Sequence, residues 1–76
     1  MNKLERITID PTVMTGRACI RGMRVTVGNI LNMLASGRTR DDILVAYPYL
    51  ENADLDACLQ YAALLANDEE LELKPK

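Results

Sequence analysis

The chain has 76 residues, enough for one domain at most. It contains no His, Trp or Phe, so it lacks the usual general base of neutral pH, and its core must be built from aliphatic residues, Met and Tyr. No apolar run approaches the roughly 18–20 residues of a membrane helix, and residues 1–9 lack the apolar region of a signal peptide. We therefore expect a cytoplasmic binding protein with no catalytic residues, no metal and no cofactor.

The net charge of −2 conceals two oppositely charged halves. Residues 1–40 hold seven basic against two acidic residues, a net of +5. Residues 41–76 hold two basic against nine acidic residues, a net of −7. Such asymmetry suggests two functional ends, a basic one for phosphate and an acidic one for a basic protein or for solubility.

The N-terminal third predicts a small β element. Ile7-Thr8-Ile9 alternates and is β-branched, which favours a short strand, and Asp10-Pro11 ends it in a turn. Residues 18–27 predict two further short strands in a hairpin, because Gly22 of the pair Arg21-Gly22 can adopt the positive φ that a tight turn needs.

Three helices follow, because the apolar period changes from two to 3.6 residues. The apolar faces of these helices are predicted to contain Val27, Ile30, Leu31 and Leu34 in the first, Ile43, Leu44 and Tyr47 in the second, and Leu55, Cys58, Leu59, Ala62 and Leu65 or Ala66 in the third.

Local signals set the helix boundaries. Gly37 stands where a C-terminal glycine cap belongs. Thr39 with Asp42 forms a capping-box pattern, and Pro48 ends the second helix. The third helix is expected to begin near Asn52. A short connection that holds a glycine between the first two helices is typical of a helix-turn-helix.

The sequence thus predicts a mostly α, three-helix, helix-turn-helix-like domain with a β-hairpin over residues 1–66, and an acidic, flexible tail over residues 67–76. We also expect a homodimer, because so short a chain buries only about 60 % of its unfolded surface and small residues line the third helix. Cys19 and Cys58 fit no metal spacing and are expected to be buried apolar residues.

Arginines are the candidate phosphate ligands, because the guanidinium group is planar, permanently charged and bidentate. The opposing interpretation is that several are surface residues or pair with the acidic helices of the same chain, Arg24 in particular. The candidate DNA-binding residues, on or beside the hairpin and around the first interhelical turn, are Arg17, Arg21, Arg24, Arg38, Thr39 and Arg40.

Three geometries of DNA contact stay open. If helices two and three form the motif, Asp54 and Asp56 stand where base edges are read, and phosphate repels them. If helices one and two form it, the basic turn at residues 38–40 is well placed. A basic hairpin entering a groove is the third geometry.

The run from Ile9 to Ala63 resembles a family of small bacterial proteins, domain of unknown function 433. The most specific segments that carry the resemblance are Ile9-Asp10-Pro11, residues 16–25, Tyr47-Pro48 and Tyr61-Ala62-Ala63. The chain departs from the pattern at Glu51, where a Thr typically caps the third helix, so Asn52 is expected to take that role.

The resemblance implies a helix-turn-helix-like antitoxin that binds operator DNA as a dimer and neutralises a toxin related to PIN-domain nucleases. By analogy with antitoxins in general, the acidic tail is the partner-binding segment. The alternative is a protein-interaction module that does not bind DNA. The candidate partner-binding residues are Asp68, Glu69, Glu70, Leu71 and Leu73.

Overall fold

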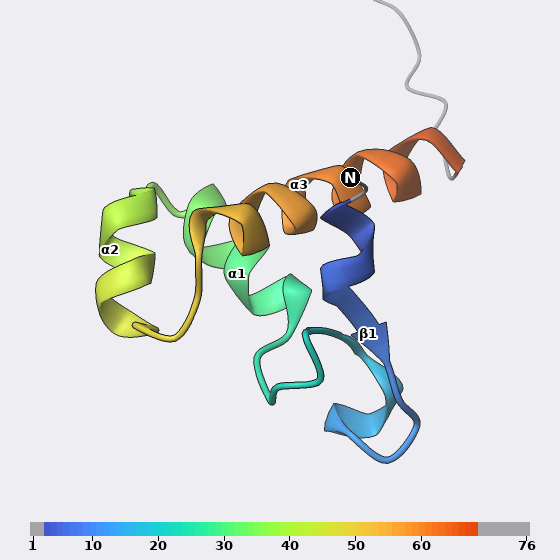
Figure 1. Ribbon diagram of the computed structural model, residues 1–76. Coiled ribbons are helices and arrows are strands. Elements are labelled where there is room, and N and C mark those ends of the chain that lie inside the picture. Colours follow the sequence, from blue (N-terminus) through green and yellow to red (C-terminus); the bar gives the residue numbers. More distant parts are fainter. Residues whose placement is uncertain (1–2, 69–76) are drawn as a thin grey trace, which may run out of the picture.

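The computed structural model describes residues 3–68 and has the predicted fold class, three α-helices after a small N-terminal β element (Figure 1). In chain order, the elements are the 3₁₀ helix η1 (Lys3–Arg6), β1 (Ile7–Ile9), the 3₁₀ helix η2 (Met14–Gly16), β2 (Ala18–Ile20), α1 (Val27–Ala35), α2 (Arg40–Ala46) and α3 (Asn52–Asp68).

The sheet has two antiparallel strands, β1 and β2, with Ile7 opposite Ile20. The strand predicted at residues 7–9 is therefore confirmed, and the predicted hairpin is confirmed only in part. The expected turn after Ile20 does form, since Gly22 has a φ of 72°. Its second arm is not a strand but makes a single bridge, Cys19 with Thr26, while β1 pairs with β2 along the other edge.

Thr26 explains why that second arm is short. Its side chain accepts a hydrogen bond from the Asn29 N–H at 3.1 Å, which caps the N-terminus of α1. Helical geometry begins directly after the capping residue, so α1 starts at Val27, where the prediction placed the end of the hairpin, and the second arm stops at its bridge residue Thr26.

The predicted end of α1 and start of α2 are confirmed. Gly37 has a φ of 95° and donates its N–H to the Leu34 carbonyl, while the Arg38 N–H donates to the Met33 carbonyl. This pair of bonds is a Schellman motif at the end of α1. The capping box of α2 is complete, with the Asp42 N–H donating to Thr39 Oγ1 and the Thr39 N–H to Asp42 Oδ2.

The third helix begins at Asn52, as expected, but Glu51 occupies the capping position, so the expectation that Asn52 caps this helix was wrong. The Glu51 carbonyl accepts from the Asp54 N–H, and the Glu51 N–H donates to Asp54 Oδ2. Asp54 thus returns the bond that a capping box requires. At its other end α3 runs to Asp68, two residues beyond the expected end of the domain.

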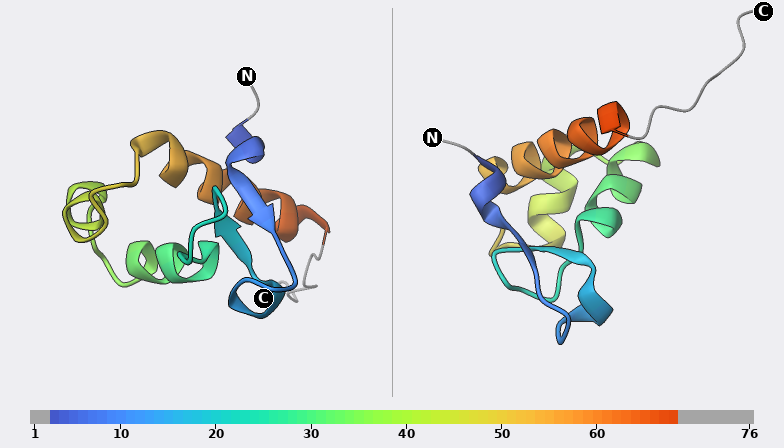
Figure 2. Two further views of the ribbon diagram at one scale, coloured as in Figure 1. Left: turned by 60° about the horizontal axis from the view of Figure 1, so that its bottom comes forward. Right: turned by 90° about the vertical axis from the view of Figure 1, so that its right-hand side faces the viewer.

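The core lies between α3, which runs along the top of the molecule in Figure 1, and the elements beneath it. Figure 2 shows the β1–β2 hairpin at one end and α2 at the other, with α1 between them. Cys19 and Cys58 are buried free thiols, which confirms their predicted environment. The core residues are Ile20, Val25, Val27, Ile30, Ile43, Leu50, Leu55 and Cys58.

No helix among residues 3–68 combines the length and the apolar character needed to cross a membrane.

Candidate nucleic-acid interface

The candidate arginines fall into two groups, and the first surrounds a buried carboxylate. Asp54 is fully buried. It accepts two bonds from Arg21, from Nε at 3.0 Å and from Nη2 at 2.8 Å, and one from Arg6 Nη1 at 2.9 Å. Arg6 also pairs with Glu51 at 2.7 Å. We call these four residues the Asp54 cluster.

Electrostatics keep Asp54 ionised. Burial raises the pKa of Asp54, but the hydrogen bonds from Arg21, from the Glu51 N–H and from Arg6 outweigh it, so the pKa lies below its ordinary value. Hydrogen bonds to Asp54 raise the pKa of Arg21. Arg21 also donates to the Tyr49 carbonyl at 3.0 Å. This arginine therefore fastens the turn after β2 to the start of α3.

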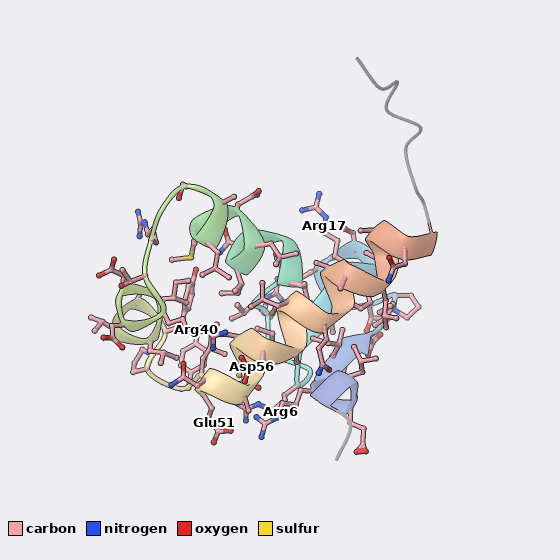
Figure 3. All side chains as sticks on the ribbon, turned by 90° about the horizontal axis from the view of Figure 1, so that it is seen from above. Arg6, Arg17, Arg40, Glu51 and Asp56 are labelled. Carbon is pink, nitrogen blue, oxygen red and sulfur yellow. The ribbon has the colours of Figure 1, made fainter. Side chains whose placement is uncertain are left out.

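Arg40 and Thr39 are also engaged within the chain. Arg40 Nη2 pairs with Asp56 Oδ1 at 2.8 Å, which ties α2 to α3. The Thr39 hydroxyl accepts the capping bond of α2. Figure 3 shows Arg40 pointing toward Asp56 and Arg6 toward Glu51, with Arg17 well away from both pairs. The structure thus gives structural contacts to three predicted DNA-binding residues, Arg21, Thr39 and Arg40.

Arg17, Arg24 and Arg38 form the second group. All three side chains are exposed, and among the described residues none of their guanidinium groups has a hydrogen bond or ion pair. The opposing interpretation, pairing with an acidic helix of the same chain, is therefore confirmed for Arg21 and Arg40, whereas no ion pair of Arg24 is seen within this part of the chain. The guanidinium groups of Arg17, Arg24 and Arg38 are open to a ligand from solution.

The exposed face of α1 lies between two of these arginines. A groove of about 450 Å³ beside the N-terminal part of α1 includes Arg17, and a second of about 450 Å³ beside its C-terminal part includes Arg38. Asn29 and Asn32 border both grooves. We call the exposed residues Arg17, Asn29, Asn32, Ser36 and Arg38 the α1 face.

Charge distinguishes the α1 face from the other helices. Among the three described α-helices, α1 alone carries no carboxylate, since α2 begins with Asp41 and Asp42 and α3 contains Asp54 and Asp56. A nine-residue helix is about 13 Å long, close to the major-groove width of about 12 Å. An arginine near each end can therefore reach phosphates on opposite sides of a groove.

Sequence reasoning missed both the α1 face and the role of Asp54. A signal for Asp54 was present, because Asp54 shares a helical face with Ala57, Cys58 and Tyr61 at spacings i, i+3, i+4 and i+7. A lone acidic residue on an apolar stripe indicates a buried ion pair. No comparable signal marked α1, because exposed asparagines are common.

Other site chemistry in the described residues is sparse. No three His, Cys, Asp or Glu side chains of residues 3–68 gather where they could hold a metal ion. Burial raises the pKa of the Cys58 thiol to about 11, so it stays protonated at neutral pH. The candidate partner-binding residues lie outside this description, apart from the backbone of Asp68 at the end of α3.

Comparison with known proteins gives a family. Residues 7–62 match the family described as "Protein of unknown function (DUF433)". Comparisons with curated proteins and with solved structures gave no match. The matched segment runs from β1 into α3 and includes Arg21, Asp54 and the whole of α1. The chain therefore belongs to the DUF433 family, as its sequence resemblance predicted.

Proposed function

We propose that the chain is a DNA-binding regulator of the antitoxin type, in which the α1 face contacts DNA. The observation that carries the proposal is a helix without carboxylates, exposed on one face, with an arginine near each end whose side chain has no bond to another described residue. Phosphate neutralisation supplies most of the affinity of small DNA-binding proteins. Arg24 is also exposed and precedes Thr26, the capping residue of α1, by two positions. It adds a third cation close to this helix in the sequence.

The α1 face also offers groups that can contact bases. The Asn32 side chain is exposed, and the amide nitrogen of Asn29 is held by the Tyr47 hydroxyl at 2.9 Å, which leaves the Asn29 carbonyl oxygen as an acceptor. Asparagine amides pair with adenine edges in the major groove. The α1 face therefore combines phosphate-binding and base-contacting chemistry.

The antitoxin part of the proposal rests on the family resemblance and on the acidic C-terminal sequence. Residues 68–73 contain four acidic residues and two leucines. Such a segment suits a basic nuclease partner related to PIN-domain toxins, and it is far in sequence from the basic residues of the α1 face.

The test is the salt dependence of binding to DNA from upstream of the gene. Affinity should fall steeply as salt rises, and each phosphate contact contributes about 0.9 to the slope of log affinity against log salt. Arg17→Ala and Arg38→Ala should each weaken binding and reduce that slope by about 1. Fluorescence anisotropy with a labelled duplex measures both quantities.

Arg40→Ala is the matched control, because it removes the same charge from a residue held by Asp56. It should leave the salt slope unchanged. Absence of salt-sensitive binding by the unmodified protein would overturn the DNA proposal. Equal effects of the three substitutions would show that overall charge, and not the α1 face, determines the affinity.

A second candidate function, a protein-interaction module that never contacts DNA, is favoured by exposed leucines on α3, since Leu59, Leu64 and Leu65 are 43–47 % exposed. This candidate predicts a stable complex with a protein partner and no DNA binding at physiological salt. Co-purification with the product of a neighbouring toxin-like gene, after nuclease treatment, separates the two functions.

A further inference from the structure

The first of the two grooves beside α1 is mainly apolar. This hollow, the Arg17 groove, lies between α1 and the second half of α3, which runs above α1 in Figure 1. Its volume of about 450 Å³ falls within the roughly 300–1,000 Å³ of small-molecule sites. Leu65 is 45 % exposed, so the described fold leaves apolar surface open here. The apolar lining residues are Ala18, Val27, Leu31, Tyr61 and Leu65.

The charge of this groove comes from Arg17. Of the described residues that line it, Arg17 alone is charged. The backbone of Arg17 is held in place, since its N–H donates to the Met14 carbonyl at 3.2 Å and its carbonyl accepts from Cys19 Sγ at 3.3 Å. Its guanidinium group makes no bond to another described residue. A planar cation beside apolar surface is complementary to a carboxylate carried on an apolar body.

Gly28 keeps one wall of the Arg17 groove open. It is the second residue of α1, is exposed and lines the groove. Glycine destabilises a helix relative to alanine, and the described fold does not require it at this position. Its φ is not positive, and a Cβ built on it would meet no neighbouring atom within 4 Å. The missing side chain therefore leaves space for an occupant.

The second groove shows why charge alone does not define the site. It also contains an arginine, Arg38, but of the described residues that line it only Met33 and Tyr47 are apolar. A DNA phosphate satisfies an arginine in such surroundings and covers no apolar surface. The apolar lining of the Arg17 groove, by contrast, gains free energy only from an apolar occupant.

We propose that the Arg17 groove binds a small monocarboxylate with an apolar body, such as a medium-chain fatty acid. The carboxylate pairs with Arg17, and the body lies against Leu31, Tyr61 and Leu65 in the space that Gly28 leaves. This site goes beyond the proposed function, and its test needs no DNA. A bound carboxylate would cover Arg17 and so lower the affinity of the α1 face for DNA, and this consequence alone rests on the proposed function.

The test follows the amide shifts of the ¹⁵N-labelled full chain during titration with octanoate. The titration runs to about 20 mM, because ligands of this size bind in the millimolar range. Octylammonium has the same body with the opposite charge, and acetate has the same charge without the body. Each should bind at least about fivefold more weakly than octanoate. Octanoate should cause saturable shifts at residues 17–18, 26–32, 61 and 65.

Two kinds of variant locate the site. Arg17→Gln should weaken octanoate binding about fivefold. Arg24→Gln is its matched control, because Arg24 is exposed but does not line the groove, and it should bind octanoate like the unmodified chain. Gly28→Leu should weaken binding at least about tenfold by filling the groove, and Gly28→Ala should weaken it less. Both replacements favour helix formation, and circular dichroism checks that each variant is folded.

Four results would overturn the proposal. Equal binding of acetate would show that Arg17 takes any anion, and equal binding of octylammonium would show that the charge of the ligand is not recognised. Octanoate binding that survives Gly28→Leu in a folded chain would place the ligand elsewhere. The same holds if the largest shifts fall at Leu59 and Leu64, which are exposed on α3 and do not line the groove.

Discussion

Arg21 and Arg38 are the same residue type in opposite surroundings. Arg21 donates two hydrogen bonds to the buried carboxylate of Asp54, which also binds Arg6. Arg38 follows α1, is exposed, and makes no side-chain bond to another described residue. The first arginine holds two parts of the chain together, whereas the second leaves its donors open to a ligand. The comparison shows that a basic N-terminal half is not a single binding surface.

The difference has a physical basis in burial. A buried carboxylate needs its hydrogen bonds satisfied inside the fold, so arginines near Asp54 are committed to it. The α1 helix has no carboxylate, so arginines beside it stay unpaired in the described part of the chain. DNA binding should therefore depend on the exposed Arg17, Arg24 and Arg38. The stability of the fold should depend on the arginines that bind Asp54.

The largest effect is expected from removal of the buried carboxylate. Asp54→Ala leaves Arg6 and Arg21 without their shared partner and the Glu51 N–H without its acceptor. We expect a loss of about 3 kcal/mol in the free energy of unfolding, the low end for a broken buried ion pair, because both arginines are partly exposed. Urea unfolding measures it. A loss below about 0.5 kcal/mol, typical of surface sites, would contradict the role of the Asp54 cluster.

Acid should weaken the same cluster. The pKa of Asp54 is lowered in the folded chain, so its ionised form adds stability that is fully present above the ordinary Asp pKa of about 3.9 and is lost as the pH falls through the folded value. Thermal midpoints should drop below about pH 4. Asp54→Asn should remove most of that dependence, apart from a remainder at Asp10, whose pKa the Thr12 N–H lowers.

The control for the acid experiment is Asp41→Asn, a change at an exposed carboxylate in the first turn of α2. It should keep the acid dependence of the unmodified chain. If Asp54→Asn loses stability with acid as steeply as Asp41→Asn does, the Asp54 cluster is not the source of the pH dependence.

The smallest stability effect is expected from Arg38→Ala, which should change the free energy of unfolding by less than about 0.5 kcal/mol, as at other surface sites. Arg21→Ala should lower the thermal midpoint clearly, because it removes two bonds to Asp54. Differential scanning calorimetry compares the two variants. Equal midpoints would remove the distinction between structural and available arginines.

Local signals made most of the fold predictable. The glycine after α1 and the Thr39–Asp42 capping box fix helix ends through bonds between residues close in sequence, so the pattern reveals them. The predicted second arm of the hairpin was too long, and the pairing of β1 with β2 was not predicted. How far the second arm can run depends on where α1 starts. The Thr26 cap decides that point, and its weak sequence signal was missed.

The candidate site was less predictable, because it depends on pairing between distant residues. Arg21 and Asp54 are 33 positions apart, and Arg40 and Asp56 meet across two helices. Only the folded arrangement shows which arginines these acids engage. The predicted arginines that make no side-chain bond within the described residues, Arg17, Arg24 and Arg38, are a subset of the candidates, and the asparagines of α1 complete the surface.

Amide chemical-shift mapping tests the central claim most directly. A duplex from upstream of the gene is titrated into the ¹⁵N-labelled chain at low salt, and the shift of each amide is followed. We expect the largest changes at residues 28–38 and at Arg17, with small changes around Asp54 and along α3. Largest changes on α2 or α3, or at the Asp54 cluster, would contradict it.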